Sequence, residues 1–206
     1  MDTPHRIKVK YFVQDPARLE LPALTPVFHR WIQERRVPGM LLDVADYKHV
    51  QDGPGIVLIG HEADYSLDLT GGRPGLVYDR KRGWEEGDAL AERVRQVFQA
   101  ALVGCQALES DLTGGLRFKL DEAELSLVDR LATPNNAENY ATASAEIRPV
   151  FDELYGHDNY TLSRASDDPR RTLTLVIHAK QPPALSAELA SLQTKSVTTN
   201  GAGKNG

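Results

Sequence analysis

The chain has 206 residues, 41% of them hydrophobic and 26% charged, which is enough to build one globular domain around a buried core. The formal net charge of −5 argues against a nucleic-acid binder, since such proteins carry a basic surface, and gives no support to an anionic membrane as partner. One cysteine, Cys105, excludes an intramolecular disulfide. With no secretory pattern and no long apolar run, we expect a cytoplasmic protein without a membrane segment.

The first predicted elements are a strand and a helix. Residues 6–13 alternate with the period of a strand, with Ile7, Val9, Tyr11 and Val13 on one side and Lys8, Lys10 and Phe12 on the other. Thr25-Pro26 favours the start of a helix, because threonine caps helices and proline fits their first turn. That helix should end before Pro38-Gly39.

Two apolar runs, residues 40–44 and 56–59, predict the next two strands. Residues 53–55 (Gly-Pro-Gly) between them form a strong turn signal, because glycine tolerates positive φ and proline fixes its own φ. Residues 75–78 predict one strand more.

The second half of the chain predicts two further helices and two hairpins. Residues 88–108 carry a long apolar stripe at helical spacing that includes Cys105, which we therefore expect to be a buried side chain. Residues 116–128 alternate around an acidic turn and predict a hairpin. Asn135 or Asn136 should open the third helix, and residues 160–177 predict a last hairpin.

The element order is thus β-α-β-β-β-α-β-β-α-β-β. It predicts an α+β fold, with a curved antiparallel sheet and about three helices packed on one face. We expect a single domain over residues 1–180 and a flexible C-terminal tail over residues 181–206, which is polar and lacks aromatic side chains. The predicted core contains Trp31, Val57, Ile59, Phe98, Leu102, Phe118, Phe151 and Leu175.

Each of the two apolar runs is followed by a similar polar cluster. Residues 45–49 read Ala-Asp-Tyr-Lys-His, and residues 61–65 read His-Glu-Ala-Asp-Tyr. We expect these clusters to meet at neighbouring strand ends and to form the functional part of the molecule. The candidate binding residues are Asp46, His49, His61, Glu62, Asp64, Tyr65 and Arg80.

A divalent metal is the candidate cofactor, because the clusters supply imidazole and carboxylate groups. The candidate ligands are His49, His61, Asp46 and Asp64. Their spacing misses the His-Glu-x-x-His pattern of metalloproteases. A structural polar network, or acid–base and ligand-recognition chemistry with His61 as proton carrier, would use the same residues.

A narrower expectation concerns the partner of His61. This histidine directly follows an apolar strand, where an unpaired ring nitrogen at the edge of the core costs about 1–3 kcal/mol. We expect its ring to lie within hydrogen-bond reach, or one water, of a carboxylate among Asp43, Asp46, Asp64 and Asp68.

The basic run at residues 80–82, preceded by Arg73 and followed by Trp84, has two interpretations. Guanidinium groups donate two parallel hydrogen bonds to phosphates and carboxylates, so the run could clamp an anion. The alternative is a solvated strand end that balances nearby acidic residues.

Residues 43–49, 53–68 and 129–135 resemble an uncharacterised family of bacterial hypothetical proteins of similar length. The resemblance covers most of the chain up to about Lys180, implies no activity and transfers no site residue. Two functions remain: a non-catalytic cytoplasmic binding or accessory protein with an unidentified protein or small-molecule partner, or a small metal-assisted hydrolase of a polar or anionic substrate. The lack of a complete catalytic signature favours the first. The sequence does not define the oligomeric state.

Overall fold

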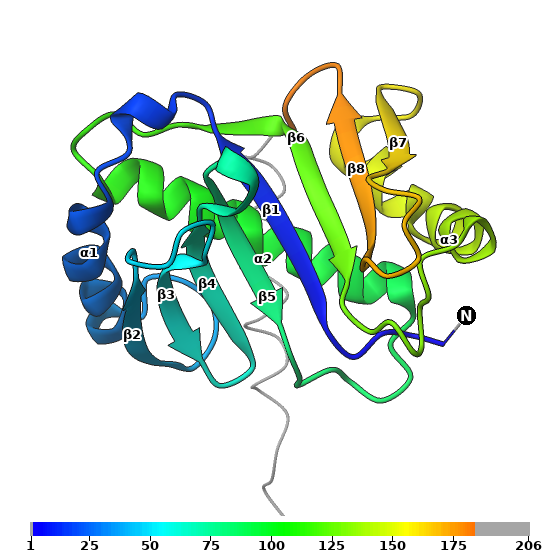
Figure 1. The fold of residues 1–206 in the computed structure, drawn as a ribbon, viewed down its shortest axis with the longest axis horizontal. Coiled ribbons are helices and arrows are strands. Elements are labelled where there is room, and N and C mark those ends of the chain that lie inside the picture. The colour runs from blue at the N-terminus through cyan, green and yellow to red at the C-terminus, as the bar shows by residue number, and fades with distance from the viewer. Residues whose placement is uncertain (1, 184–206) are drawn as a thin grey trace, which may run out of the picture.

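The structure is a computed structural model that describes residues 2–183. Its eight strands form one open sheet in the order β2-β3-β4-β5-β1-β6-β8-β7, and every neighbouring pair is antiparallel (Figure 1). The predicted α+β class, antiparallel sheet and three helices are confirmed. The elements are β1 (Ile7–Val13), α1 (Leu21–Glu34), β2 (Leu41–Tyr47), β3 (Gly55–Gly60), β4 (Ala63–Asp68), β5 (Gly75–Arg80), α2 (Leu90–Asp111), β6 (Phe118–Leu127), α3 (Ala137–Tyr155), β7 (Tyr160–Arg164) and β8 (Leu173–Ala179).

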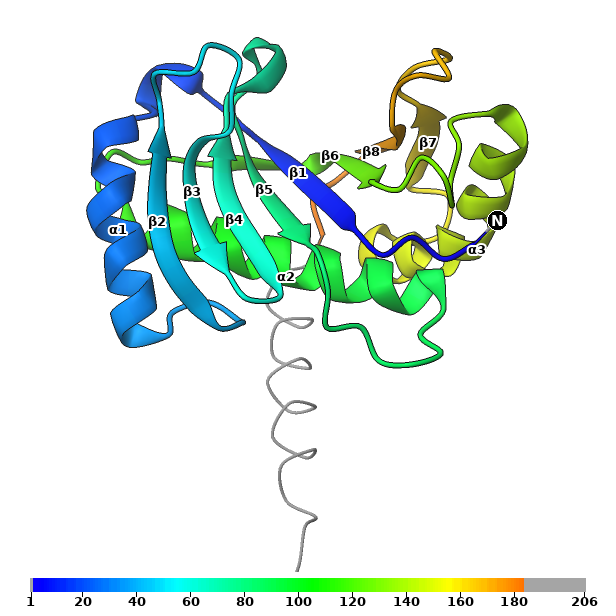
Figure 2. The same ribbon diagram turned by 60° about the horizontal axis from the view of Figure 1, so that its bottom comes forward.

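The three helices pack on one face of the sheet and leave the other face open. Helix α1 packs on β2 and β3, α2 crosses beneath β1 and β5, and α3 packs on β7 and β8 (Figure 2). Because each helix has one apolar stripe, one sheet face is enough to bury all three stripes.

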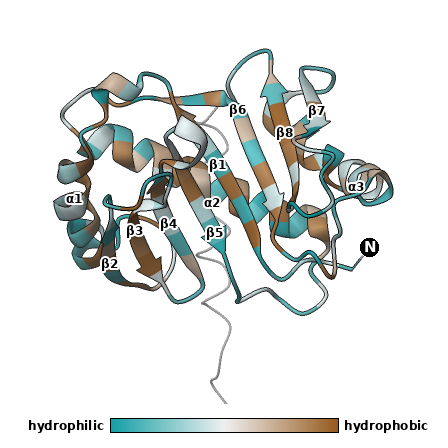
Figure 3. Ribbon diagram, in the orientation of Figure 1, coloured by the Kyte–Doolittle hydropathy of each residue, from teal (hydrophilic) through white to brown (hydrophobic). Residues whose placement is uncertain are grey.

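Alternation along the strands divides the side chains between the two faces. On β1, Ile7, Val9 and Tyr11 are fully buried against the helices, while Lys8 and Lys10 point to the open face. The same alternation of apolar and polar residues is visible along the central strands in Figure 3. The open face therefore carries the polar half of the strand residues.

The predicted core is largely confirmed. Six of its members and Cys105 are buried. The prediction that Val57 and Ile59 belong to the core was wrong, since on β3 it is Ile56 and Leu58 that are fully buried against the helices. Residues 56–59 are all apolar, so their pattern does not indicate which pair faces the core. The confirmed core residues are Trp31, Phe98, Leu102, Phe118, Phe151 and Leu175.

Two segments differ from the sequence prediction. The second polar cluster, predicted over residues 61–65, runs into the strand β4 (residues 63–68). The hairpin predicted over residues 116–128 is replaced by the single strand β6, residues 118–127. The predicted turn is an irregularity in β6, where the pairing with β1 passes from Ala123 to Lys119 between Tyr11 and Phe12. Because β6 pairs with β1 on one side and β8 on the other, ladder hydrogen bonds hold the acidic segment extended.

The helix ends are partly as predicted. Asn136 caps α3 by accepting a hydrogen bond from the Asn139 N–H at 2.8 Å, and Gly156 ends that helix at φ 87°. Helix α1 begins at Leu21 and not at the expected Thr25. Its first turn contains a proline of its own, Pro22, which serves as well as Pro26 there.

Within residues 2–183, no helix is long and apolar enough to cross a membrane. Most of the predicted tail, residues 184–206, lies outside the described residues.

Candidate functional site

The two predicted polar clusters lie at opposite ends of β3. Tyr47 pairs with Gly55 where β3 begins, and Leu41 pairs with Gly60 where it ends. The cluster that contains His49 is therefore separated from the one that contains His61 by the length of the strand, about 17–20 Å. The expectation that they meet was wrong. The C-terminal ends of successive strands lie at the same end of a parallel sheet. In an antiparallel hairpin such as β2–β3 they lie at opposite ends.

His61 pairs with its neighbour and not with the predicted carboxylates. Its Nδ1 lies 3.0 Å from Glu62 Oε1, and 55% of the His61 side chain is exposed. The hydrogen bond lowers the pKa of Glu62 from its ordinary value. Within the described part of the chain, His61 has no direct hydrogen bond or ion pair with Asp43, Asp46, Asp64 or Asp68, so the prediction of a direct contact was wrong.

The candidate metal ligands do not form a metal centre. Asp46 accepts hydrogen bonds from the backbone and side chain of Lys48, which lower its pKa, and Asp64 pairs with Lys81 at 2.7 Å. His49 lies in the β2–β3 turn with its ring centroid 6.4 Å from that of Tyr47. Among residues 2–183 no three histidine, cysteine, aspartate or glutamate side chains are grouped so that they could hold a metal ion.

Tyr65 and Arg80 have structural partners. The Tyr65 ring is fully buried and its hydroxyl donates to the Pro38 carbonyl at 3.2 Å; burial raises the pKa of this tyrosine well above its ordinary value. Arg80 donates to Gln96 Oε1 at 2.9 Å, and its guanidinium lies 4.4 Å from the ring centroid of Trp84. These contacts favour the structural interpretation of the basic run.

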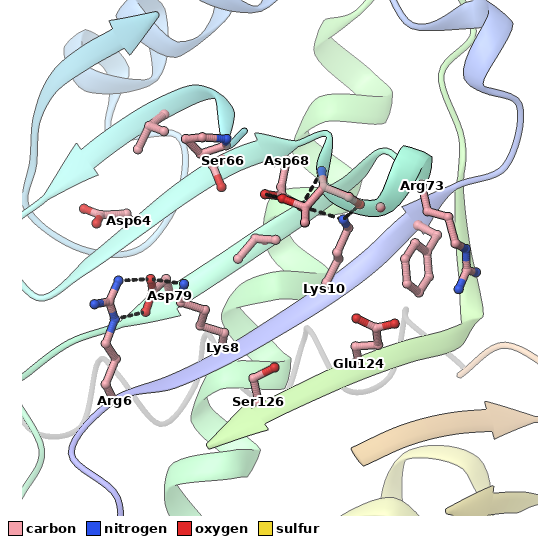
Figure 4. A pocket seen from close by; sticks show the side chains of 16 residues that line it. Arg6, Lys8, Lys10, Asp64, Ser66, Asp68, Arg73, Asp79, Glu124 and Ser126 are labelled. Atoms are coloured by element: carbon pink, nitrogen blue, oxygen red, sulfur yellow. Dashed lines mark hydrogen bonds and ion pairs between the residues drawn. The ribbon is translucent and has the colours of Figure 1, made fainter. Parts of the chain in front are cut away.

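The open face holds a different site, a hollow of about 510 Å³ over β4, β5, β1 and β6 (Figure 4). This volume is within the range of about 300–1,000 Å³ that is typical of small-molecule sites. The residues that line the hollow are Arg6, Lys8, Lys10, Phe12, Pro54, Val57, Asp64, Ser66, Asp68, Thr70, Gly71, Arg73, Val77, Asp79, Glu124 and Ser126.

One charged group in the hollow is centred on Asp79. Arg6 approaches this carboxylate with two atoms, Nε at 2.8 Å and an Nη at 2.5 Å, and Lys8 Nζ lies 3.3 Å away. The pairing of Lys8 with Asp79 across β1 and β5 brings these residues together on the open face. Asp79 is only 7% exposed, and the two positive charges of its partners exceed its single negative charge.

A second charged pair, Lys10 and Asp68, joins two strands that are not neighbours. Lys10 lies on β1 and Asp68 on β4, with β5 between them. At the crossing point β5 carries Gly75, and a Cβ built there would lie 2.9 Å from Lys10 Cε. Since no side chain intervenes, Lys10 Nζ reaches Asp68 Oδ1 at 2.5 Å, and Lys10 is left only 8% exposed.

The part of the hollow near β6 contains Glu124. This half-buried carboxylate pairs in register with Lys10, yet it makes no hydrogen bond or ion pair within residues 2–183, because Lys10 reaches to Asp68. Nearby, the Arg73 guanidinium stacks on the Phe12 ring at 3.7 Å and donates to Glu122 at 2.5 Å. The hollow therefore contains one carboxylate without a counter-ion in the described chain.

Sequence reasoning missed the hollow, although a signal for it was present. Asp64, Ser66 and Asp68 recur at every second position, as do Glu122, Glu124 and Ser126. In strands, that spacing puts polar groups on one face. The charged face of a sheet is ordinarily its solvated face, and only the order of the strands shows that these two sets flank the Lys8–Lys10 pair.

The arrangement can hold a small polar molecule through charge and hydrogen bonds, with Phe12 and Val77 supplying apolar contact. Comparison with models of known protein families found no match, and comparison with curated proteins found none either.

Proposed function

We propose that this protein is a non-catalytic, cytoplasmic binding protein that holds a small polar molecule in the hollow on the open face of its sheet. The observation that carries the proposal is the set of charged side chains gathered there on four adjacent strands. Lys10 and Asp79 are at most 8% exposed, and a charge that is partly removed from water costs free energy unless it is well paired.

Two features of these side chains support binding over a purely structural role. Arg6 and Lys8 both bind one carboxylate, Asp79, and retain donors that have no partner in the described chain. Ser66, which lines the hollow, is 9% exposed, and its hydroxyl makes no hydrogen bond within residues 2–183. A polar ligand would supply partners to such groups.

The test is a screen of small polar molecules (acids, amines, zwitterions and sugars) by ligand-observed NMR, with a variant that fills the hollow. Ser66 stands between Val57 and Val77 on neighbouring strands, so Ser66→Phe places a ring in the hollow and removes no charge. Thr161→Phe is the matched control on the same sheet face, on β7 and outside the hollow.

We expect molecules that bind the wild type and the Thr161→Phe variant to lose binding to Ser66→Phe, with both variants folded by circular dichroism. Equal binding by all three proteins, or no binding by any molecule in the set, would overturn the proposal. The metal-assisted hydrolase has no comparable support, because its candidate ligands are separated by the length of β3.

A further inference from the structure

We infer that the ligand of the hollow is a zwitterion, with an ammonium group bound by Glu124 and a carboxylate or similar anion bound by Arg6 and Lys8. This inference rests on the proposed function and names the class of molecule that the site accepts.

The cationic end of the ligand follows from the charge around Glu124. The other three carboxylates that line the hollow are paired: Asp64 with Lys81, Asp68 with Lys10, and Asp79 with Arg6 and Lys8. Glu124 has no counter-ion among residues 2–183. A ligand ammonium supplies that counter-ion, and it can also donate to a hydroxyl such as Ser126, two residues along the same strand.

The anionic end follows from the charge around Asp79. Arg6 and Lys8 carry two positive charges against the single negative charge of this carboxylate. Their side chains are 43% and 37% exposed, so both keep free donors that face solvent. A second carboxylate or a phosphate would neutralise the excess charge and occupy these donors.

The strand register places the two ends of the site close together. Lys8 pairs with Ser126, and Glu124 lies two residues before Ser126 on β6. Lys8 and Glu124 are thus diagonal neighbours on one face, with backbone positions about 7–8 Å apart. The Lys8 ammonium turns away from Glu124 to Asp79 on β5, so a ligand that reaches both groups must span at least this distance. The sheet therefore selects molecules whose opposite charges are separated by a short chain, and it disfavours an α-amino acid such as glycine, whose charges are adjacent.

The experiment measures the binding of 6-aminohexanoate by NMR titration, because its extended chain places the ammonium and carboxylate about 7–8 Å apart. Hexanoate and hexylamine are the probes that carry one charge each, and glycine is the short zwitterion. We expect 6-aminohexanoate to bind at least about tenfold more tightly than any of the three, since it alone satisfies both ends.

Two carboxylate variants test the cationic end. Glu124→Gln should weaken the binding of 6-aminohexanoate about tenfold and leave the binding of hexanoate unchanged. Asp68→Asn should act in the same direction, because Lys10 then loses its partner and can turn to Glu124, its neighbour on β6. The matched control is Asp158→Asn, an exposed loop carboxylate outside the hollow, which should have no effect.

The outcomes separate the inference from the proposed function. Suppose that a molecule of another class binds the wild type but not Ser66→Phe, and binds Glu124→Gln as tightly as the wild type. The hollow is then a binding site, and the zwitterion inference is wrong. Equal binding of 6-aminohexanoate and hexanoate would also overturn the inference. If neither these probes nor the wider set bind, both the inference and the proposed function fall.

Discussion

The ion pair between Lys10 and Asp68 should contribute strongly to stability, and its contribution can be measured by a double-mutant cycle. Lys10→Met leaves Asp68 with two hydrogen bonds from Thr70, from the N–H at 3.2 Å and from Oγ1 at 2.9 Å. Asp68→Asn leaves Lys10 with the Thr70 carbonyl, at 3.3 Å, and with Glu124, its neighbour on β6, to which it can turn. Because both side chains are mostly buried yet retain some partners, we expect each change to cost about 2 kcal/mol, below the 3–5 kcal/mol of a fully buried pair.

The double variant should cost little more than either single variant, since it leaves no unpaired charge. The expected coupling energy is therefore about 2 kcal/mol, obtained from urea unfolding of the four proteins at pH 7. The control cycle uses Lys48 and Asp46, which lie 2.8 Å apart in an exposed turn and should couple much more weakly. A coupling for Lys10 and Asp68 as small as that of the control would refute the account of how charges are held in the hollow.

Three further predictions concern the core, the pH dependence and the polar clusters. Phe98→Ala should lower the free energy of unfolding by about 3–5 kcal/mol in urea titrations, because Phe98 is fully buried between Tyr11 and Phe151; a loss below about 1 kcal/mol would contradict this. Burial raises the pKa of Tyr78 to about 12, so the unfolded chain loses this proton first as pH rises above about 10. Stability should therefore fall from pH 9 to pH 11 by about 1 kcal/mol more in the wild type than in Tyr78→Phe, and equal slopes would exclude that cause. His61→Gln should change stability by less than about 0.5 kcal/mol and leave ligand binding unchanged, since His61 is exposed; lost binding would restore it as a site residue.

The sequence predicted the fold class because the elements carry local signals. The apolar stripe through Phe98 and Leu102 predicted α2, and the asparagines at 135 and 136 predicted the start of α3. Such signals depend on residues within one or two turns of one another. For that reason they do not depend on how distant segments of the chain pair.

The sequence failed where an answer depended on distant strands. The acidic residues of β6 look like a turn until β1 and β8 are known to pair on either side. The apolar residues 56–59 do not show which of them face the helices. Both outcomes are set by pairings far apart in the chain.

The site was missed for the same kind of reason. The polar clusters around His49 and His61 are close in sequence but lie at opposite ends of β3. Lys10, Asp68 and Glu124 are far apart in sequence, yet they meet because β4, β5, β1 and β6 are neighbours in the sheet. The order of the strands decides which polar groups share a site, and no local pattern encodes that order.

The most direct test of the central claim is to map, by backbone amide chemical shifts, where the tightest-binding molecule of the small-molecule set contacts the protein. If the hollow is the binding site, the shifted amides will belong to residues 8–12, 64–68, 75–79 and 122–126, on the four strands that carry its charged side chains. Shifts confined to residues 45–49 or 60–62, at the ends of β3, would contradict the account and return the function to the polar clusters.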